Sequence, residues 1–242
     1  MILMSESPFV RLSNNNKHPY QLHHSLRAKR LSIKLSSLGK LTVILPQGMK
    51  ASLAHSFVQK KSPWIEKHLN NLTVKPVKSF PPKHLNLKML NEKWSIRYKQ
   101  GSKKHIEYSE YPQNCLLITG DIQSNQLVNK IIGLFLKNKA IKPFTQMIAE
   151  IASQHDFQYA GFTVRGQKTR WGSCSSQKNL SLNYKLLLMP KQVVRSVFIH
   201  ELCHTIEMNH SANFWKLVEK YDPNHRQHNQ YLKENADIIQ HF

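Results

Sequence analysis

The sequence contains few cysteines, few acidic residues and no long apolar run. Its 242 residues include three cysteines, Cys115, Cys174 and Cys203, which form neither an even disulfide set nor a zinc-binding spacing. Reduced thiols in a cytoplasmic protein are therefore expected. No apolar stretch approaches the length that spans a bilayer, and residues 1–4 are too few for the apolar part of a secretion signal. We expect a protein without a membrane partner.

The shortage of acidic residues leaves a large positive charge. There are 14 aspartates and glutamates against 35 lysines and arginines, so the formal net charge is +21. The basic residues are spread over both halves of the chain, with local clusters such as 27–30 and 137–142. A basic surface raises affinity for anionic partners, although a solvated face is its commoner meaning. Non-specific nucleic-acid binding is therefore an alternative role.

The most informative residues are 200–204, His-Glu-Leu-Cys-His. On a helix, positions i and i+4 lie on one face, so His200 and His204 can reach one metal ion. Zinc lowers the pKa of a bound water to about 7, and Glu201 between the histidines can accept its proton as general base. Cys203 should face away from this site and pack within the helix. The motif predicts a zinc-dependent hydrolase.

A catalytic zinc site needs a third protein ligand, and His210 is the first choice because it follows His204 by six residues. The chain must turn to deliver it. We expect Asn209 to end the helix in a left-handed conformation and Ser211 to cap the next helix. Four other residues are rival ligands: Glu207, Glu219, His225 and His228.

Two elements lead into the motif. Residues 179–188 alternate between leucine or tyrosine and mostly polar residues, which predicts a strand. Pro190 then suits the first turn of a helix with an apolar stripe that continues into the motif. If the predicted strand is a sheet edge beside the metal, it can hold an extended peptide by backbone pairing.

Four linked segments resemble one family. They are Thr169-Arg170-Trp171-Gly172-Ser173-Cys174-Ser175, Asn179-Leu180-Ser181-Leu182-Asn183, the HELCH motif, and Asn209-His210-Ser211 followed by Phe214-Trp215. This combination resembles the YgjP-like metal-dependent hydrolases, which are relatives of the SprT-like and WLM zincin domains. The resemblance implies a zincin-type fold with one Zn²⁺ on His200, His204 and His210, and Glu201 as general base.

Arg170 and Asn183 are candidate substrate-binding residues. Arg170, with the nearby Lys168 and Arg165, can offer cationic donors to a carboxylate, a phosphate or a developing oxyanion. The competing interpretation is a structural loop in which Arg170 pairs with a carboxylate. Gly172 permits a tight turn in either case.

The expected fold class is α+β, with a β-rich N-terminal region in residues 1–120 and a zincin-like metallohydrolase domain in residues 121–242. A hairpin over 31–45, a helix over 52–72 interrupted near Pro63, and a linker over 75–83 precede four short strands between 85 and 119. Helical spacing begins near 121, a strand is expected over 157–164, and a helix over 227–242 closes the chain. No internal repeat is present at solenoid periods.

The leading functional hypothesis is a zinc metallopeptidase acting on peptides or proteins. One alternative is a nucleotide or phosphoester hydrolase of the nucleoside triphosphate pyrophosphatase type. The other is a basic nucleic-acid-binding protein with a structural zinc. Structural sites usually use four protein ligands, and the sequence offers no evident fourth, which disfavours the last hypothesis. The oligomeric state stays open.

Overall fold

The computed structural model describes residues 8–36, 39–70, 80–101 and 105–240. The chain divides into two compact units, Met1–Lys78 and Ser79–Phe242, called here the first and second unit. The expected linker over 75–83 lies mostly outside the described residues, as does part of the turn in the expected hairpin. In the part of the chain that the structure describes, no helix is both long and apolar enough to cross a membrane.

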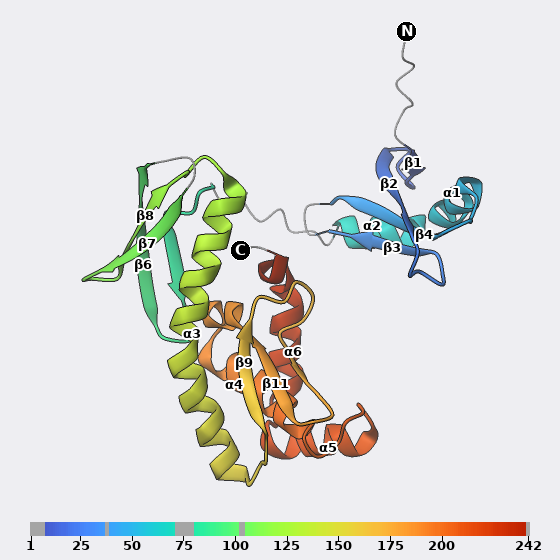
Figure 1. Ribbon diagram of the computed structural model, residues 1–242. Helices are drawn as coiled ribbons and strands as arrows, with labels where there is room; N and C mark the ends of the chain where they lie inside the picture. Colours follow the sequence, from blue (N-terminus) through green and yellow to red (C-terminus); the bar gives the residue numbers. More distant parts are fainter. Residues whose placement is uncertain (1–7, 37–38, 71–79, 102–104, 241–242) are drawn as a thin grey trace. The chain divides into compact units, whose positions relative to one another are not determined.

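The first unit is a four-stranded sheet with two helices (Figure 1). Its elements are β1 (Phe9–Arg11), β2 (Lys17–Ser25), β3 (Ser32–Leu35), β4 (Leu41–Pro46), α1 (Ala51–Lys60) and α2 (Ser62–Asn70), with strand order β1-β2-β4-β3. Antiparallel pairing of β3 with β4 confirms the predicted hairpin. The interruption near Pro63 is also confirmed, because α1 ends at Lys60 and Pro63 lies in the first turn of α2, where proline is tolerated.

Apolar residues at alternate positions of β4 form part of the core of this unit. Leu41, Val43 and Leu45 are almost completely buried, while the residues between them are half-buried. Because side chains alternate across a strand, one face of β4 is apolar along its whole length. Ala54 and Val58, one turn apart on α1, belong to the same buried cluster.

The second unit begins with another four-stranded sheet followed by a long helix. Its elements are β5 (His84–Leu87), β6 (Glu92–Gln100), β7 (Ile106–Tyr111), β8 (Cys115–Gly120) and α3 (Asn125–His155), with strand order β5-β6-β8-β7. These strands confirm the four predicted between 85 and 119.

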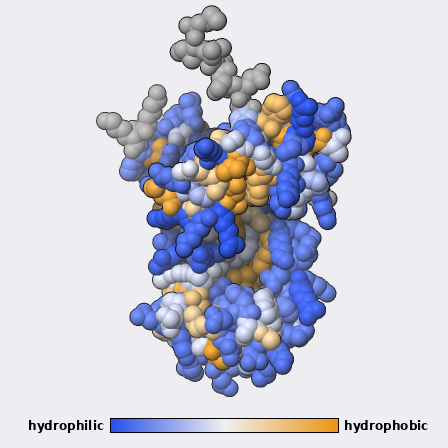
Figure 2. All heavy atoms as spheres, turned by 90° about the vertical axis from the view of Figure 1, so that its right-hand side faces the viewer, coloured by the Kyte–Doolittle hydropathy of each residue, from blue (hydrophilic) through white to orange (hydrophobic). Residues whose placement is uncertain are grey.

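On the face of the molecule shown in Figure 2, hydrophilic residues predominate, which agrees with the excess of lysine and arginine.

The sheets of the two units share one topology. In each, the first and second strands are antiparallel, the second and fourth are parallel, and the third and fourth are antiparallel. Equivalent strands begin 75 residues apart from Lys17 to Glu92 and 74 apart from Leu41 to Cys115. A helix follows the fourth strand in both units. The arrangement β1 to β4 and α1 is therefore repeated as β5 to β8 and α3.

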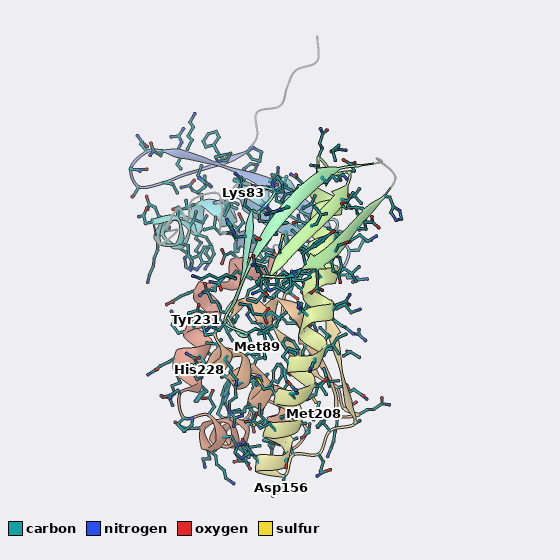
Figure 3. The ribbon with its side chains drawn as sticks, turned by 90° about the vertical axis from the view of Figure 1, so that its left-hand side faces the viewer. Lys83, Met89, Asp156, Met208, His228 and Tyr231 are labelled. Carbon is teal, nitrogen blue, oxygen red and sulfur yellow. The ribbon has the colours of Figure 1, made fainter. Side chains whose placement is uncertain are left out.

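The domain boundary differs from the expected division between residues 120 and 121, because α3 packs against the sheet that precedes it. The ring of Phe135 on α3 packs edge-on against Trp94 of β6, with centroids 4.9 Å apart. Met89, labelled in Figure 3, follows β5 and donates its N–H to the carbonyl of Leu187 at 3.2 Å. One apolar core therefore runs from Leu85 to Leu232. The β5 to β8 sheet belongs to the second unit, and the units divide between Lys78 and Ser79.

The α3 helix has well-defined ends. Ser124 caps its start by accepting a hydrogen bond from the N–H of Leu127, and Asp156, labelled in Figure 3, ends it in the left-handed conformation. The helix contains Pro143 and extends along both sheets of the second unit (Figure 1). It thus ties the β5 to β8 sheet to the sheet beside the HELCH helix.

The remaining elements surround the HELCH motif. They are β9 (Gly161–Arg165), β10 (Gly172–Cys174), β11 (Asn179–Asn183), the 3₁₀ helix η1 (Tyr184–Leu188), α4 (Lys191–Cys203), α5 (Ala212–Tyr221), α6 (His225–Glu234) and the 3₁₀ helix η2 (Ala236–Gln240). The predicted strand over 179–188 is too long, because it ends at Asn183. The predicted closing helix ends at Glu234, before the short turn of η2.

The three-stranded sheet has the order β10-β11-β9, so β11 is its central strand. β11 pairs with β9 in parallel and with β10 antiparallel. The condition that residues 179–188 form a sheet edge is therefore not met, and β10 is the edge strand nearest the motif helix. α4 packs against this strand.

Candidate metal centre

The helix α4 presents both histidines of the HELCH motif at its C-terminal end. It begins at Lys191, one residue later than the sequence predicts, because Pro190 is the N-cap residue and not part of the first turn. His200 and His204 are one turn apart, and their ring centroids are separated by 5.0 Å. Val194, Val197 and Phe198 are buried in the core and fix the helix against the rest of the unit. The motif therefore lies on a rigid element.

The chain leaves α4 through a tight turn. The N–H groups of Thr205 and Ile206 donate to the carbonyls three residues earlier, Leu202 and Cys203. Asn209 does not adopt the expected left-handed conformation, because these short-range bonds end the helix before that residue is reached. Ser211 caps α5 as expected, with its hydroxyl accepting from the N–H of Phe214 at 3.2 Å. Turn and cap together bring His210 back to the end of α4.

The side chains of His200, His204 and His210 converge. One ligand atom from each residue lies within 4.8 Å of the others. The Nε2 atoms of His200 and His210 are 3.2 Å apart. Two nitrogen ligands of a tetrahedral zinc ion are about 3.3 Å apart, because each Zn–N bond is about 2.0–2.1 Å. The spacing of these two nitrogens therefore fits a shared ion.

The four rival ligand candidates lie outside the convergent histidine group. The Glu219 carboxylate is 3.9 Å from the Arg226 guanidinium, and the Nδ1 atom of His228 is 3.0 Å from an Asp222 oxygen. His225 is stacked on the ring of Trp215. Among the described residues, the convergent histidine group contains none of the four rivals.

The fourth rival, Glu207, has a different role. Its backbone carbonyl oxygen is 3.0 Å from Nδ1 of His204. A carbonyl can only accept, so this Nδ1 carries the proton and Nε2 keeps its free lone pair. Metal-bound histidines commonly donate their second N–H to a carbonyl in this way, which fixes the tautomer and the ring orientation. Glu207 therefore orients a candidate ligand through its main chain.

Burial keeps the imidazoles of His200 and His204 neutral. Burial first, and then the charges of three neighbouring histidines, lower the pKa of His200 to about 4. Burial also lowers the pKa of His204, although its hydrogen bond to Glu207 opposes the shift. Neutral imidazole is the form that binds a metal. At neutral pH, His200 and His204 need not lose a proton before they bind an ion.

Two aromatic rings pack against the three histidines. Phe214 is fully buried and stacks on His204 with centroids 4.3 Å apart. Trp215 lies against His200 at 5.8 Å and against His210 at 5.7 Å. Both rings come from the first turns of α5, the helix capped by Ser211. The Phe214-Trp215 segment of the sequence pattern therefore forms part of the wall of the candidate site.

Glu201 is buried beside the edge strand. It is 6% exposed, and burial raises its pKa to about 8, although the guanidinium of Arg170 opposes the shift. A Cβ atom added to Gly172 in β10 would lie 2.6 Å from an oxygen of Glu201. Glycine is therefore required at this position because the carboxylate occupies the space of a side chain.

The two candidate substrate-binding residues have different surroundings. Arg170 is exposed and its charge acts on Glu201. Asn183, in contrast, is fully buried, and its amide donates to the carbonyls of Gln167 and Arg170 at 2.8 and 3.0 Å. Its oxygen accepts from the N–H of Lys185. The substrate-binding role expected for Asn183 is therefore corrected: it holds the loop before β10 in place.

Cys203 is completely buried in the core, as the packing interpretation expects. Burial raises the pKa of its thiol to about 12, so the thiol stays protonated at neutral pH. A protonated, buried thiol is a poor metal ligand.

The comparison with family models decides the identity of the chain. The model of the YgjP-like metallopeptidase domain matches residues 29–235. The chain belongs to the YgjP-like metallopeptidase family. The three histidines, Glu201 and the edge strand all lie within the matched part of this YgjP-like chain.

The YgjP-like chain was also compared with curated proteins and solved structures. No curated protein matches it. A matching solved structure is the crystal structure of the metallopeptidase zymogen of Pyrococcus abyssi abylysin, with a TM-score of 0.34 and 20% identity. The match covers 37% of the YgjP-like chain and 92% of abylysin.

Proposed function

We propose that this YgjP-like protein is a zinc-dependent metallopeptidase whose ion is held by His200, His204 and His210. The observation that carries the proposal is the convergence of one ligand atom from each histidine within 4.8 Å. Three imidazoles are a donor set that suits zinc, and catalytic zinc sites use three protein ligands. The ion would activate a water molecule and polarise the scissile carbonyl.

Glu201 is the general base in this proposal. It accepts a proton from the attacking water and passes it to the amine that leaves when the peptide bond breaks. The burial that raises its pKa to about 8 keeps it close to the pH at which it must both take and give a proton. A cation held by the neighbouring histidines would favour its ionised form, as Arg170 does.

The substrate would bind as an extended peptide along β10. This strand is the edge of its sheet, and Gly172 brings its backbone next to Glu201. An edge strand carries backbone groups that can pair with an added strand. Arg170, exposed beside Glu201, would contact the substrate or the charge that develops on it.

The test is a comparison of the zinc-loaded protein with Glu201→Gln. We expect peptide hydrolysis to fall by about 10²–10⁴-fold, because that is the usual contribution of a general base. Zinc content should be unchanged, since Glu201 is not a proposed ligand. New amino groups in the wild-type reaction identify peptide cleavage.

Two outcomes would contradict the proposal. Undiminished peptide hydrolysis by Glu201→Gln would remove the general base. Release of phosphate or pyrophosphate from nucleotides, without new amines and sensitive to the same substitution, would identify the alternative phosphoester hydrolase.

A further inference from the structure

A cavity lies on the β9 to β11 sheet, whose edge strand β10 contacts the proposed general base at Gly172. Its volume is about 410 Å³. The residues on which the inference rests are Thr163, Arg165, Arg170, Ser173, Cys174 and Ser181, all of which line it. No aspartate or glutamate is among the residues that form its walls.

The register of the sheet places three hydroxyl groups in a row across this face. Ser173 of β10 pairs with Ser181 of β11, and Ser181 pairs with Thr163 of β9. Side chains of paired residues lie on the same face, and the next residues on β11, Leu180 and Leu182, are buried on the opposite face. The sheet therefore has an apolar side toward the core and a hydroxyl-lined side toward the cavity.

Hydrogen bonds order these groups. The hydroxyls of Thr163 and Ser181 are 3.1 Å apart, and Arg165 donates from Nε to the Thr163 hydroxyl at 3.2 Å. Arg165 is two residues after Thr163 on β9, so both lie on the same face. The bond through Nε leaves the two terminal nitrogens of the guanidinium for another acceptor.

The two arginines bring positive charge to the cavity and form no direct ion pair with a described carboxylate. Among the described residues, no carboxylate lies within 4.0 Å of the guanidinium of Arg165 or Arg170. Guanidinium and hydroxyl donors together match an oxyanion, and arginine binds a carboxylate with two parallel hydrogen bonds. The cavity is thus complementary to a carboxylate.

The cavity and the proposed general base both border the strand β10. Cys174, in the wall of the cavity, is on the same three-residue strand as Gly172, which lies against Glu201. After burial, the charge of Glu201 is the next cause that raises the pKa of the Cys174 thiol. Paired residues share a face, so Gly172 and Cys174 lie on the core side of the sheet with Glu201, while Ser173 faces the cavity. A peptide paired along β10 would therefore direct alternate side chains toward Glu201 and toward the cavity.

We propose that this cavity is a carboxylate subsite, and that the protein selects peptides with an acidic side chain or a C-terminal carboxylate close to the scissile bond. The inference rests on the proposed peptidase function, because it names the substrate class of the same site. Both sources present the same group, so the experiment must separate them.

The test measures peptide binding to full-length, zinc-loaded Glu201→Gln protein by calorimetry. Three kinds of hexapeptide share one neutral sequence: the amidated parent, amidated variants that each carry one glutamate at a different position, and the parent with a free C-terminal carboxylate. We expect the second or the third to bind about tenfold or more tightly than the first, since hydrogen bonds to charged groups contribute at least that much. Whichever binds identifies the source of the carboxylate.

Adding Arg165→Gln should remove the difference between charged and neutral peptides. Adding Arg97→Gln, at an exposed arginine of β6 in the same unit, is the matched control and should leave it intact. Arg165→Lys keeps the positive charge and should therefore retain part of the difference in affinity between charged and neutral peptides. Circular dichroism and zinc content verify that each variant is folded and loaded.

Equal affinity for all three peptides would overturn the inference, as would equal losses from Arg165→Gln and Arg97→Gln. Tight binding of inorganic phosphate with no preference among the peptides would also overturn it and assign the cavity to a phosphoryl group. These affinities do not depend on turnover. Failure of the subsite is therefore distinguishable from failure of the peptidase, which the unmodified Glu201 protein and its Gln variant test.

Discussion

Lys185 carries an amine into the core of the second unit, where the residue is 1% exposed. Its Nζ donates to the backbone carbonyl of Ile239 in η2, so it joins η1 to the end of the described chain. Burial, with a further contribution from the charge of Lys168, lowers its pKa to about 8 from 10.5. A buried charged amine is costly, and deprotonation relieves the cost.

The stability of the protein should therefore depend on pH through Lys185. Between pH 8 and 10.5 the unfolded chain binds this proton more strongly than the folded chain, so folding stability rises with pH across that window. We expect Lys185→Met to be more stable than wild type at pH 7, by about 1–3 kcal/mol, and to lose that advantage toward pH 10. Thermal unfolding of both proteins from pH 7 to 10 measures it. If the stabilities of the two proteins change in parallel from pH 7 to 10, Lys185 has an ordinary pKa and the account is wrong.

At the residue scale, the chemistry of the candidate site could be predicted where local spacing sets it. The four-residue spacing of His200 and His204 places both on one helix face whatever the rest of the fold does. The Ser211 cap is equally local. Asn183 was misassigned because its role depends on the carbonyls of Gln167 and Arg170, which approach it only after the loop has folded.

At the scale of elements, the contact between β10 and α4 controls the position of Glu201. The Gly172→Ala variant places a methyl group 2.6 Å from the carboxylate oxygen and 2.8 Å from its Cγ. Glu201 must move, and displacement by about 1 Å costs on the order of 10²-fold in rate. We expect a loss of about tenfold or more in kcat for peptide hydrolysis, with zinc retained.

Gly161→Ala is the matched control for this contact. Gly161 begins β9 in the same sheet, and a Cβ there meets its nearest atom at an ordinary 3.6 Å. Activity measured side by side should be close to wild type for Gly161→Ala and reduced for Gly172→Ala. Equal activity of the two variants would contradict the account of Gly172.

The extent of elements was harder to predict than their existence. The alternation of residues 179–188 continues past Asn183, but Asn183 accepts a hydrogen bond from the N–H of Lys185 and starts the 3₁₀ turn of η1. The pattern of Leu186 and Leu188 therefore reflects burial of a turn. The order of strands in the sheet could not be predicted from the sequence either, because pairing between distant segments decides which strand is an edge.

At the scale of the whole molecule, two units of similar sheet topology follow one another. The expected boundary at residues 120 and 121 followed the change from β to helical patterning. The structure keeps β5 to β8 with α3, because Leu116, Ile132 and Phe135 share one core. The repeated topology is absent from simple sequence periodicity, since it is a similarity of pairing and spacing of strands.

All three candidate ligands and their supporting contacts lie in the second unit. We therefore expect a fragment of residues 79–242 to fold and bind about one zinc ion per chain, because its core is complete within that range. Circular dichroism and metal analysis of the fragment and the full chain measure this. A folded fragment without zinc would show that the first unit completes the site.

The central claim is that His200, His204 and His210 form a zinc site. Its most direct test is the metal content, by mass spectrometry, of protein purified without added metal, for the wild type, His210→Ala and Glu219→Ala. We predict about one zinc per chain in the wild type and in Glu219→Ala, and its loss in His210→Ala. No zinc in the wild type even after reconstitution, or loss of zinc with Glu219→Ala alone, would contradict the account.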